Sequence, residues 1–310
     1  MKKIATKITL ADIAHEARVG VATVDRVLNK RAAVKESTAR RVLEAARRLG
    51  FTLEQPHYRL AAGKAPVTIR MGFILLQESH SFYLPLARAL TREAAPWLPA
   101  GQAEVLGLVA LDHPLIRHAV ARAAARGVRV LTLLSDLSVP QRSGYIGLDN
   151  HKAGRTAAWF IERLCRGNGE IGIIIGDNRF TCQESCEISF RSCLREQGKG
   201  QQILEPVRSH ERADIARTVT EQMLTQYPAL QAIYAPCGGV EGIVDALRDS
   251  GRQQEIALVC HGPLSDSELA LIDGTIDIML NHRLDEFAAV TLRAMADAAS
   301  RPHSEVISLP

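Results

Sequence analysis

The chain has 310 residues, of which 46% are hydrophobic and 23% charged, a composition that suits a small domain followed by a larger one. It contains no run of about 18 apolar residues, and its N-terminus lacks the apolar segment of a signal peptide, so we expect a cytoplasmic protein without a membrane-spanning helix. The charge is unevenly distributed along the chain. Residues 1–64 contain 14 Lys and Arg but 6 Asp and Glu, a net charge of +8. Because the whole chain has a net charge of +4, residues 65–310 have a net charge of −4. A basic segment ahead of an acidic one favours contact between the first segment and a polyanion.

Three short helices are predicted at the start of the chain. The first begins at Thr9, which precedes Asp12 in the Ser/Thr-x-x-Asp/Glu pattern that starts helices. We expect Gly20 to supply the turn into a second helix over residues 21–29, and a third helix over residues 37–49. The apolar positions that can pack the first two helices together are Leu10, Ile13, Ala14, Ala17, Val24, Val27 and Leu28.

The second helix has the form of a helix that reads DNA, because small and polar residues lie away from its apolar face. These residues are Val21, Ala22, Thr23, Arg26 and Asn29. Short residues near the N-terminal end allow the backbone to approach base edges in the major groove, and Arg26 can reach a guanine or a phosphate. The alternative is a three-helix bundle whose only role is packing.

Residues 9–51 resemble the headpiece of the LacI family of transcriptional regulators almost from end to end. The matching patterns are Thr-Leu-x-Asp-Ile-Ala, Val-x-x-x-Thr-Val-x-Arg-Val-Leu-Asn, Val-x-x-x-Thr-x-x-x-Val and Leu-Gly-Phe. By this resemblance, bases would be read by Val21, Ala22 and Arg26, and the DNA backbone would be bound by Thr9, Thr23 and Asn29. Gly20 and Asp25 stand where the family often has Ser, so the operator preference does not carry over.

Residues 55–66 form the predicted linker between a helix-turn-helix head, residues 1–54, and a body, residues 67–310. A proline near the start of the linker and a glycine near its end suit a short helix. In the LacI family the matching segment is a hinge helix that becomes ordered on DNA. By this resemblance Leu60 would be a wedge that enters the minor groove and bends the operator. A plain flexible linker is the alternative.

Short apolar runs alternate with amphipathic stretches throughout the body. The runs predict strands at residues 69–76, 104–111, 128–134, 144–148, 171–176, 232–235, 256–259 and 276–280. The stretches predict helices at residues 83–96, 114–126, 151–166, 183–197, 211–226, 239–250, 265–273 and 284–299. This alternation predicts an α/β fold of two Rossmann-like lobes, each a parallel sheet covered by helices, with a ligand cleft at the carboxyl ends of the strands.

The body resembles periplasmic sugar-binding proteins over about residues 67–290, in phrases such as YIGLDNHKAGRTAAWFI and GTIDIML. The resemblance implies a homodimeric LacI-type regulator, a repressor that binds a pseudo-palindromic operator in double-stranded DNA and is controlled by a sugar or polyol effector. The candidate effector-binding residues near the expected cleft are Phe82, Tyr83, Asp136, Asp149, Asn150, Glu184, Cys186, His261 and His282.

The body departs from that pattern in two ways. One β-α unit, about 30 residues long in relatives, is missing between the first body helix and the strand near residue 107. In addition, Cys186, Ala235 and Gly262 stand where relatives commonly carry Arg, Asn and an acidic residue. Because sugar hydroxyls need such polar partners, these losses favour a second hypothesis, in which the body is a dimerisation scaffold without an effector.

The sequence contains no catalytic or cofactor motif, since P-loop, GxGxxG, GxSxG and HExxH patterns are absent. Its cysteines form no CxxC pair and no zinc-type spacing, so we expect free thiols. These cysteines are Cys165, Cys182, Cys186, Cys193, Cys237 and Cys260. We therefore predict a protein that is not an enzyme and that uses no cofactor and no metal.

Overall fold

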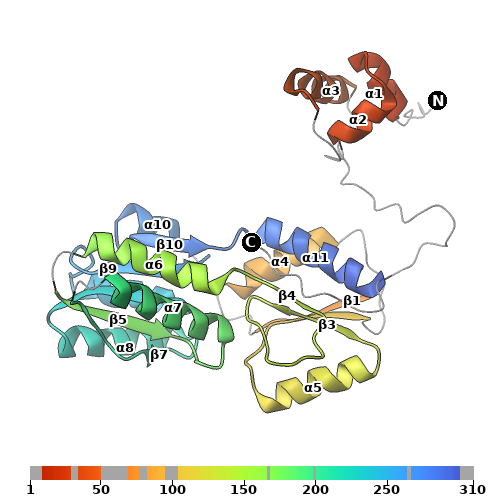
Figure 1. Cartoon of the computed structure of the whole chain (residues 1–310). Coiled ribbons are helices and arrows are strands. Elements are labelled where there is room, and N and C mark those ends of the chain that lie inside the picture. The colour runs from red at the N-terminus through yellow and green to blue at the C-terminus, as the bar shows by residue number, and fades with distance from the viewer. Residues whose placement is uncertain are drawn as a thin grey trace, which may run out of the picture. The chain divides into compact units, whose positions relative to one another are not determined.

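The computed structural model of the chain describes residues 9–28, 34–49, 69–76, 82–94, 104–165, 168–197, 200–263 and 267–300. Two compact units make up the chain, Met1–Val67 and Thr68–Pro310, and we call them the head and the body (Figure 1). Within the described residues, every helix is too short or too polar to cross a membrane.

The head contains three helices that share one small core. They are α1 (Leu10–Ala17), α2 (Val21–Leu28) and α3 (Glu36–Arg48). The buried residues of the core come from all three helices and are Ile13, Ala14, Ala17, Val24, Val42, Ala45 and Ala46. The predicted helices are therefore present in the structure, and Val24 and Val27 anchor α2 to its neighbours.

The turn between α1 and α2 differs from the one expected. Arg18, and not Gly20, takes the left-handed conformation there, with φ 51°. The backbone N–H of Arg18 donates to the carbonyls of Ala14 and His15, which closes α1. Gly20 instead accepts at its carbonyl from Thr23 N at 2.8 Å, so it precedes the first turn of α2.

The first lobe of the body is a parallel sheet of four described strands in the order β1-β2-β3-β4. The strands are β1 (Met71–Ile74), β2 (Val105–Leu108), β3 (Arg129–Leu133) and β4 (Gly144–Ile146). The helices are α4 (Tyr83–Ala94), α5 (Pro114–Ala125) and α11 (Leu284–Ser300). α4 and α11 cover one face of the sheet and α5 covers the other (Figure 1). Alternation along β3 places Leu131 and Leu133 in the core under α4 and α11, and Val130 in the core under α5.

The second lobe is a larger parallel sheet in the order β10-β9-β8-β5-β6, with β7 also paired to β5. Its strands are β5 (Glu170–Ile175), β6 (Gln202–Ile203), β7 (Val207–Arg208), β8 (Leu230–Ala235), β9 (Ala257–Gly262) and β10 (Ile278–Asn281). Its helices are α6 (Asn150–Leu164), α7 (Thr181–Gln197), α8 (Ala213–Gln226), α9 (Val240–Asp249) and α10 (Ser267–Ile272). Cores lie on both faces, one shared with α6 and α7 and the other with α8, α9 and α10.

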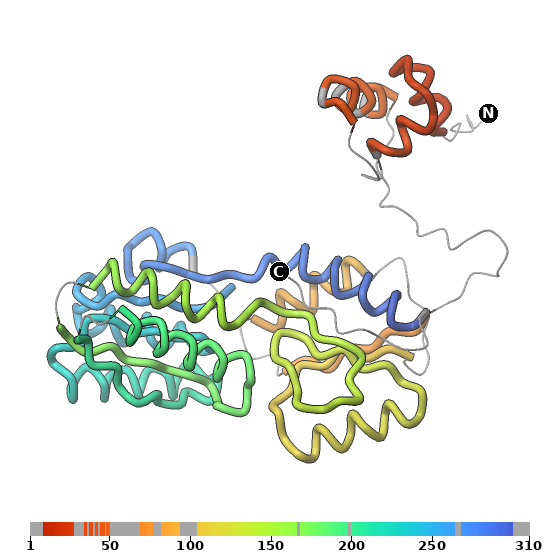
Figure 2. Tube along the Cα trace, viewed as in Figure 1, coloured from red at the N-terminus to blue at the C-terminus, as the bar shows by residue number. Residues whose placement is uncertain are grey.

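The described chain passes between the lobes after β4 and again after β10, as the tube in Figure 2 shows. α6 therefore starts the second lobe, and α11 returns to pack on α4 in the first lobe. The predicted two-lobed α/β fold is confirmed, and the only described strands that sequence patterning missed are β6 and β7, of two residues each. The gap attributed to a missing β-α unit includes residues 95–103, which lie outside the described residues; β1 forms one end of the described four-stranded sheet.

Candidate functional site

The exposed side of α2 is the candidate DNA-contacting surface of the head. Val21, Ala22 and Arg26 are exposed, with Val21 at 48%, while Val24 on the opposite face is fully buried. Thr23 is half-buried. The buried face fixes the rotation of α2 about its axis, so the residues that sequence patterning assigned to DNA contact point away from the core.

Thr9, the other described residue predicted to contact DNA, is exposed and caps α1. Its side chain accepts from Asp12 N at 3.3 Å, while the Asp12 carboxylate accepts from Thr9 N at 2.7 Å. These hydrogen bonds to Thr9 hold the pKa of Asp12 below its usual value. Asn29 and Leu60 lie outside the described residues.

A cavity of about 210 Å³ lies between the two lobes of the body. The first lobe contributes Phe82, Tyr83 and Leu134 to its wall, and the second lobe contributes residues from the carboxyl ends of its strands and the start of α7. The remaining lining residues are Asn150, Cys182, Gln183, Cys186, Glu211, Ala213, Pro236, Cys237, Gly238, Gly239, Glu241, His261, Gly262, Pro263 and His282. The cavity therefore occupies the position at which this fold places ligands.

A carboxylate is fixed in the second-lobe wall by backbone and side-chain donors. Glu211 Oε1 accepts from Gln183 Nε2 at 2.7 Å, and Glu211 Oε2 accepts from Gly238 N at 3.0 Å. Gln183 is itself held by Gly176 N, which donates to its Oε1 at 2.7 Å. A Cβ on Gly176 would fall 1.7 Å from Glu211 Oε1, so only glycine leaves room for this carboxylate.

Two histidines line the cavity in neutral form. The ring of His261 forms a 3.0 Å hydrogen bond between Nε2 and the hydroxyl of Tyr234, which is fully buried and stacked on Phe190. Burial lowers the pKa of His261 to about 3, and burial lowers the pKa of His282 to about 4. At neutral pH these imidazoles contribute hydrogen-bonding groups and flat surfaces to the cavity but no positive charge.

A series of hydrogen bonds links the segment after β4, where the chain passes from the first lobe to the second, to the cavity wall. Asn150 Nδ2 donates to the Tyr145 hydroxyl at 3.2 Å, and that hydroxyl donates to the Leu134 carbonyl at 3.0 Å. On its other side, Asn150 Oδ1 accepts from the Cys186 thiol, with the sulfur 3.9 Å away. Asn150 thus joins the first-lobe loop to α7.

The thiols in the wall are neutral. Burial raises the pKa of Cys182 to about 11 and that of Cys186 to about 12, and burial also raises the pKa of Cys237 well above the usual value. All six cysteines are reduced. In the part of the chain that the structure describes, no group of His, Cys, Asp and Glu is arranged to hold a metal ion.

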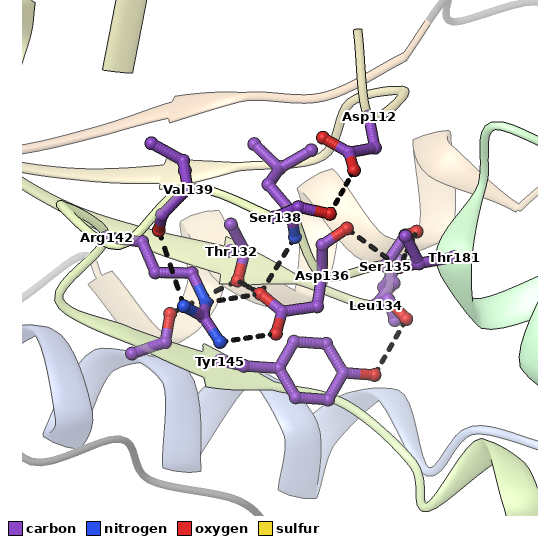
Figure 3. Close-up of polar contacts among 12 residues, drawn as sticks. Asp112, Thr132, Leu134, Ser135, Asp136, Ser138, Val139, Arg142, Tyr145 and Thr181 are labelled. Carbon is purple, nitrogen blue, oxygen red and sulfur yellow. Dashed lines mark hydrogen bonds and ion pairs between the residues drawn. The ribbon is translucent and has the colours of Figure 1, made fainter. Parts of the chain in front are cut away.

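Three of the candidate effector residues do not reach the cavity. Asp136 turns toward Arg142, which binds both carboxylate oxygens at 2.7 and 2.8 Å, and its Oδ1 also accepts from the Thr132 hydroxyl (Figure 3). Glu184 is exposed on α7. Asp149 caps α6 by accepting from Lys152 N at 3.0 Å. The structure brings Phe82, Tyr83, Asn150, Cys186, His261 and His282 to the cavity wall.

The loop that holds Asp136 also joins the lobes. The Thr181 hydroxyl, at the start of α7, donates to the Asp136 carbonyl at 2.8 Å and lies 3.3 Å from the Ser135 hydroxyl (Figure 3). Nearby, Asp112 N donates to the Arg179 carbonyl at 2.8 Å. These contacts cross from the first lobe to the second, so relative movement of the lobes has to break or remake them.

Sequence patterning missed Gln183, Glu211 and Glu241, which all line the cavity. Each stands at or near the start of a predicted helix, where an acidic or polar residue is common because it favours the helix dipole. The signal that could have identified them is their place in the segments that follow the carboxyl ends of β5, β7 and β8. Of the positions where relatives carry polar groups, Cys186 and Gly262 line the cavity, whereas Ala235 is buried in the sheet core.

Two family models match the chain, one over each unit. The model of bacterial regulatory proteins of the lacI family matches residues 9–53, and that of the periplasmic binding protein domain matches residues 98–301, more than half of the chain. Catabolite control protein A of Priestia megaterium is 41% identical over 83 residues, which are 27% of this chain and 24% of that protein. The chain thus matches about a quarter of the length of this relative.

The body is similar to solved sugar-binding structures. The glucose-galactose binding protein GanP from Geobacillus stearothermophilus matches with a TM-score of 0.70 at 16% identity, over 78% of this chain and 95% of that one. A solute binding protein from Agrobacterium vitis with bound D-fucose matches with a TM-score of 0.70 at 15% identity, over 76% of this chain and 91% of that one. At such identities the similarity shows the fold. The chain therefore belongs to the family of the periplasmic binding protein domain, and its helix-turn-helix head, residues 9–53, matches the lacI family of bacterial regulatory proteins.

Proposed function

We propose that the protein is a DNA-binding transcription regulator of the cytoplasm, a repressor, whose operator affinity is set by a small molecule bound between the lobes of the body. The observation that carries the proposal is α2, which is anchored by the buried Val24 and presents Val21, Ala22 and Arg26 to solvent. A short helix of this form fits the major groove. The cavity between the lobes supports the second part, because ligands of this fold bind at the carboxyl ends of the strands.

The DNA contacts are tested by selecting operators from a random duplex library with the full chain and measuring affinity by fluorescence anisotropy. In the proposal Arg26 contacts a base, so Arg26→Ala lowers specific affinity by about 10- to 100-fold and relaxes the preference at one position. Arg122→Ala, which removes an exposed charge from α5 of the body, is the control and leaves affinity unchanged. Equal losses on specific and random DNA would assign Arg26 to the phosphate backbone instead.

We further propose that two copies of the chain bind the two halves of a pseudo-palindrome. Thr9, Thr23 and Asn29 would position the head on the backbone, and Leu60 would open the minor groove between the half-sites. Replacing Leu60 by Gly removes the wedge, so DNA bending in a gel-phasing assay and specific affinity both fall. Unchanged bending in this variant contradicts the hinge role, and a monomer in sedimentation with and without DNA contradicts the pairing.

The proposed effector is a sugar or polyol. The cavity of about 210 Å³ is smaller than the roughly 300–1,000 Å³ of drug-sized sites, so it suits a molecule of about monosaccharide size. Neutral polar groups at Asn150 and His261 can pair with hydroxyls, and Phe82 can stack on a sugar ring. Isothermal titration against pentoses, hexoses and inositols tests this. Silence from folded protein would favour a body that serves only as a dimerisation scaffold.

A further inference from the structure

The strand β1 lies at one end of the described four-stranded sheet, where β2 is its neighbour. The Ile74 carbonyl points toward β2, because it accepts from Val109 N at 2.9 Å. Backbone groups alternate in direction from one residue of a strand to the next, so the N–H and C=O groups of Met71 and Phe73 point away from β2. Among the described residues, no strand pairs with this outer edge of β1. The edge is therefore open to a further strand.

The side chains of β1 do not protect this edge. Proteins commonly block an edge strand with lysine, proline or a bulge, because these prevent pairing with another chain. Residues 69–76 contain no lysine or proline, and their one charged residue, Arg70, forms an ion pair with Glu104 at 3.0 Å. Ile74 has an exposed fraction of 52%. The edge is therefore apolar, and pairing would remove apolar surface from water.

The other strands that end a described sheet are less suited to pairing. β4 is mostly buried, since Gly144 and Ile146 are both buried. β10 is preceded by the exposed Asp277 and ends on the exposed Asn281. β6 and β7 have two residues each. β1 is thus the described edge that favours association with another strand.

The outer edge of β1 is its own complement. A two-fold axis at Gly72 would run two copies of β1 antiparallel and place Met71 opposite the partner's Phe73. Residues opposed in this way exchange both N–H···O=C bonds, so the outer groups of both residues would all be paired. Gly72 would face the partner's Gly72 in the closer kind of pair, where no side chain separates the backbones. Ile74 would lie against the aliphatic part of the partner's Arg70.

The place of β1 in the chain also favours a second copy as the occupant. β1 is the first described strand after the predicted linker, residues 55–66, and begins at Met71. In the antiparallel pair, the two Met71 Cα atoms would lie within about 10 Å of each other. A linker of this length spans at most about 40 Å. Two heads could therefore reach half-sites that lie about 34 Å apart, one helical turn of DNA.

We propose that two copies of the chain associate through β1, whose antiparallel pairing about a two-fold axis at Gly72 joins the two first-lobe sheets into one. This inference rests on the proposed function, because it takes two copies to bind one operator. A partner chosen by charge fits this edge less well, since the one charge in residues 69–76 is already paired with Glu104. A second β1 supplies both the hydrogen-bonding groups and the apolar contact.

The first test is sedimentation velocity of the full chain over a range of concentrations. Ile74→Lys places a charge opposite the partner's Arg70, so the dissociation constant of the dimer rises at least tenfold. Leu115→Lys makes the same change at another exposed apolar residue, on α5, and leaves the constant unchanged. A dimer that tolerates Ile74→Lys, or loses equally in both variants, overturns the pairing through β1 and leaves the proposed function standing. A wild-type monomer with and without DNA overturns both this pairing and the two-copy operator proposal, while the reading of DNA by Arg26 is tested separately.

The second test is disulfide cross-linking under mild oxidation. In the proposed pair the two Gly72 Cα atoms lie about 4.5 Å apart, so Gly72→Cys forms a covalent dimer. The two Ile74 residues lie about 14 Å apart along the strands, so Ile74→Cys does not, and wild type controls for the native thiols. A dimer in which Gly72→Cys stays unlinked overturns the proposal. If Gly72→Cys does not fold, a mixture of Arg70→Cys and Ile74→Cys decides, because these positions oppose each other and the mixture alone should cross-link.

Discussion

At the scale of single residues, the wall of the cavity depends on a glycine that faces a carboxylate. Gly176 N supports Gln183, and the missing Cβ of Gly176 leaves space for Glu211 Oε1. Gly176→Ala should therefore displace Glu211 and lower the stability of the body by about 1–3 kcal/mol, measured by urea unfolding. In a Glu211→Ala background the same change should cost much less, because the clashing group is gone. A cost of equal size in both backgrounds would show that the clash is not the cause.

Two half-buried imidazoles in the cavity wall make the stability of the body depend on pH. The folded pKa of His261 is about 3 and that of His282 about 4, below the ordinary value of 6.5. Below pH 6.5 the unfolded chain binds protons that the folded body does not, so stability falls as the pH drops from 6.5 toward 4 and is restored above 6.5. Denaturant unfolding of His282→Gln at several pH values should give a shallower fall. His118→Gln, at an exposed site, should leave the profile unchanged.

At the scale of elements, the turn between α1 and α2 places a residue other than glycine in the left-handed backbone conformation. Arg18 ends α1 with φ 51°, a region that costs a residue with a Cβ about 1–2 kcal/mol relative to glycine. Arg18→Gly should therefore stabilise the α1–α2 pair by about 1 kcal/mol, seen as several-fold slower hydrogen exchange in peptides from residues 9–28. Arg18→Ala removes the same side chain but retains the strain, so it should give no gain. Equal protection in both variants would exclude backbone strain as the reason.

At the scale of the whole molecule, the proposed regulator links two binding events. If the effector changes operator affinity by some factor, the operator has to change effector affinity by the same factor, because the coupling free energy is one quantity. The contacts between Thr181 and the Asp136 loop, which join the lobes, are where such a change would be set. Titrating effector with and without operator, and operator with and without effector, should give equal ratios. A ratio of one in both titrations would show that the two sites are not coupled.

The periodicity of the sequence alone determined most of the architecture. Apolar residues spaced for helices and strands predicted the three head helices, the alternating body and the two lobes, because these patterns depend on neighbours in the chain. Strands β6 and β7 escaped because two residues carry no periodic signal. The left-handed residue of the turn is Arg18 and not Gly20, which the sequence could not show because a residue with a Cβ rarely takes this conformation.

The cavity was decided only by the tertiary structure. Sequence patterning could nominate Phe82, Asn150 and His261, but Asp136 was taken by Arg142 and Glu184 faced solvent. Whether a polar side chain meets a ligand depends on which partner it finds once the chain has folded. The carboxylate of Glu211 illustrates this, because Gln183, Gly176 and Gly238 meet it only once three strands lie side by side. The sequence determined the fold through local patterns, and long-range packing set the charge and chemistry of the cavity.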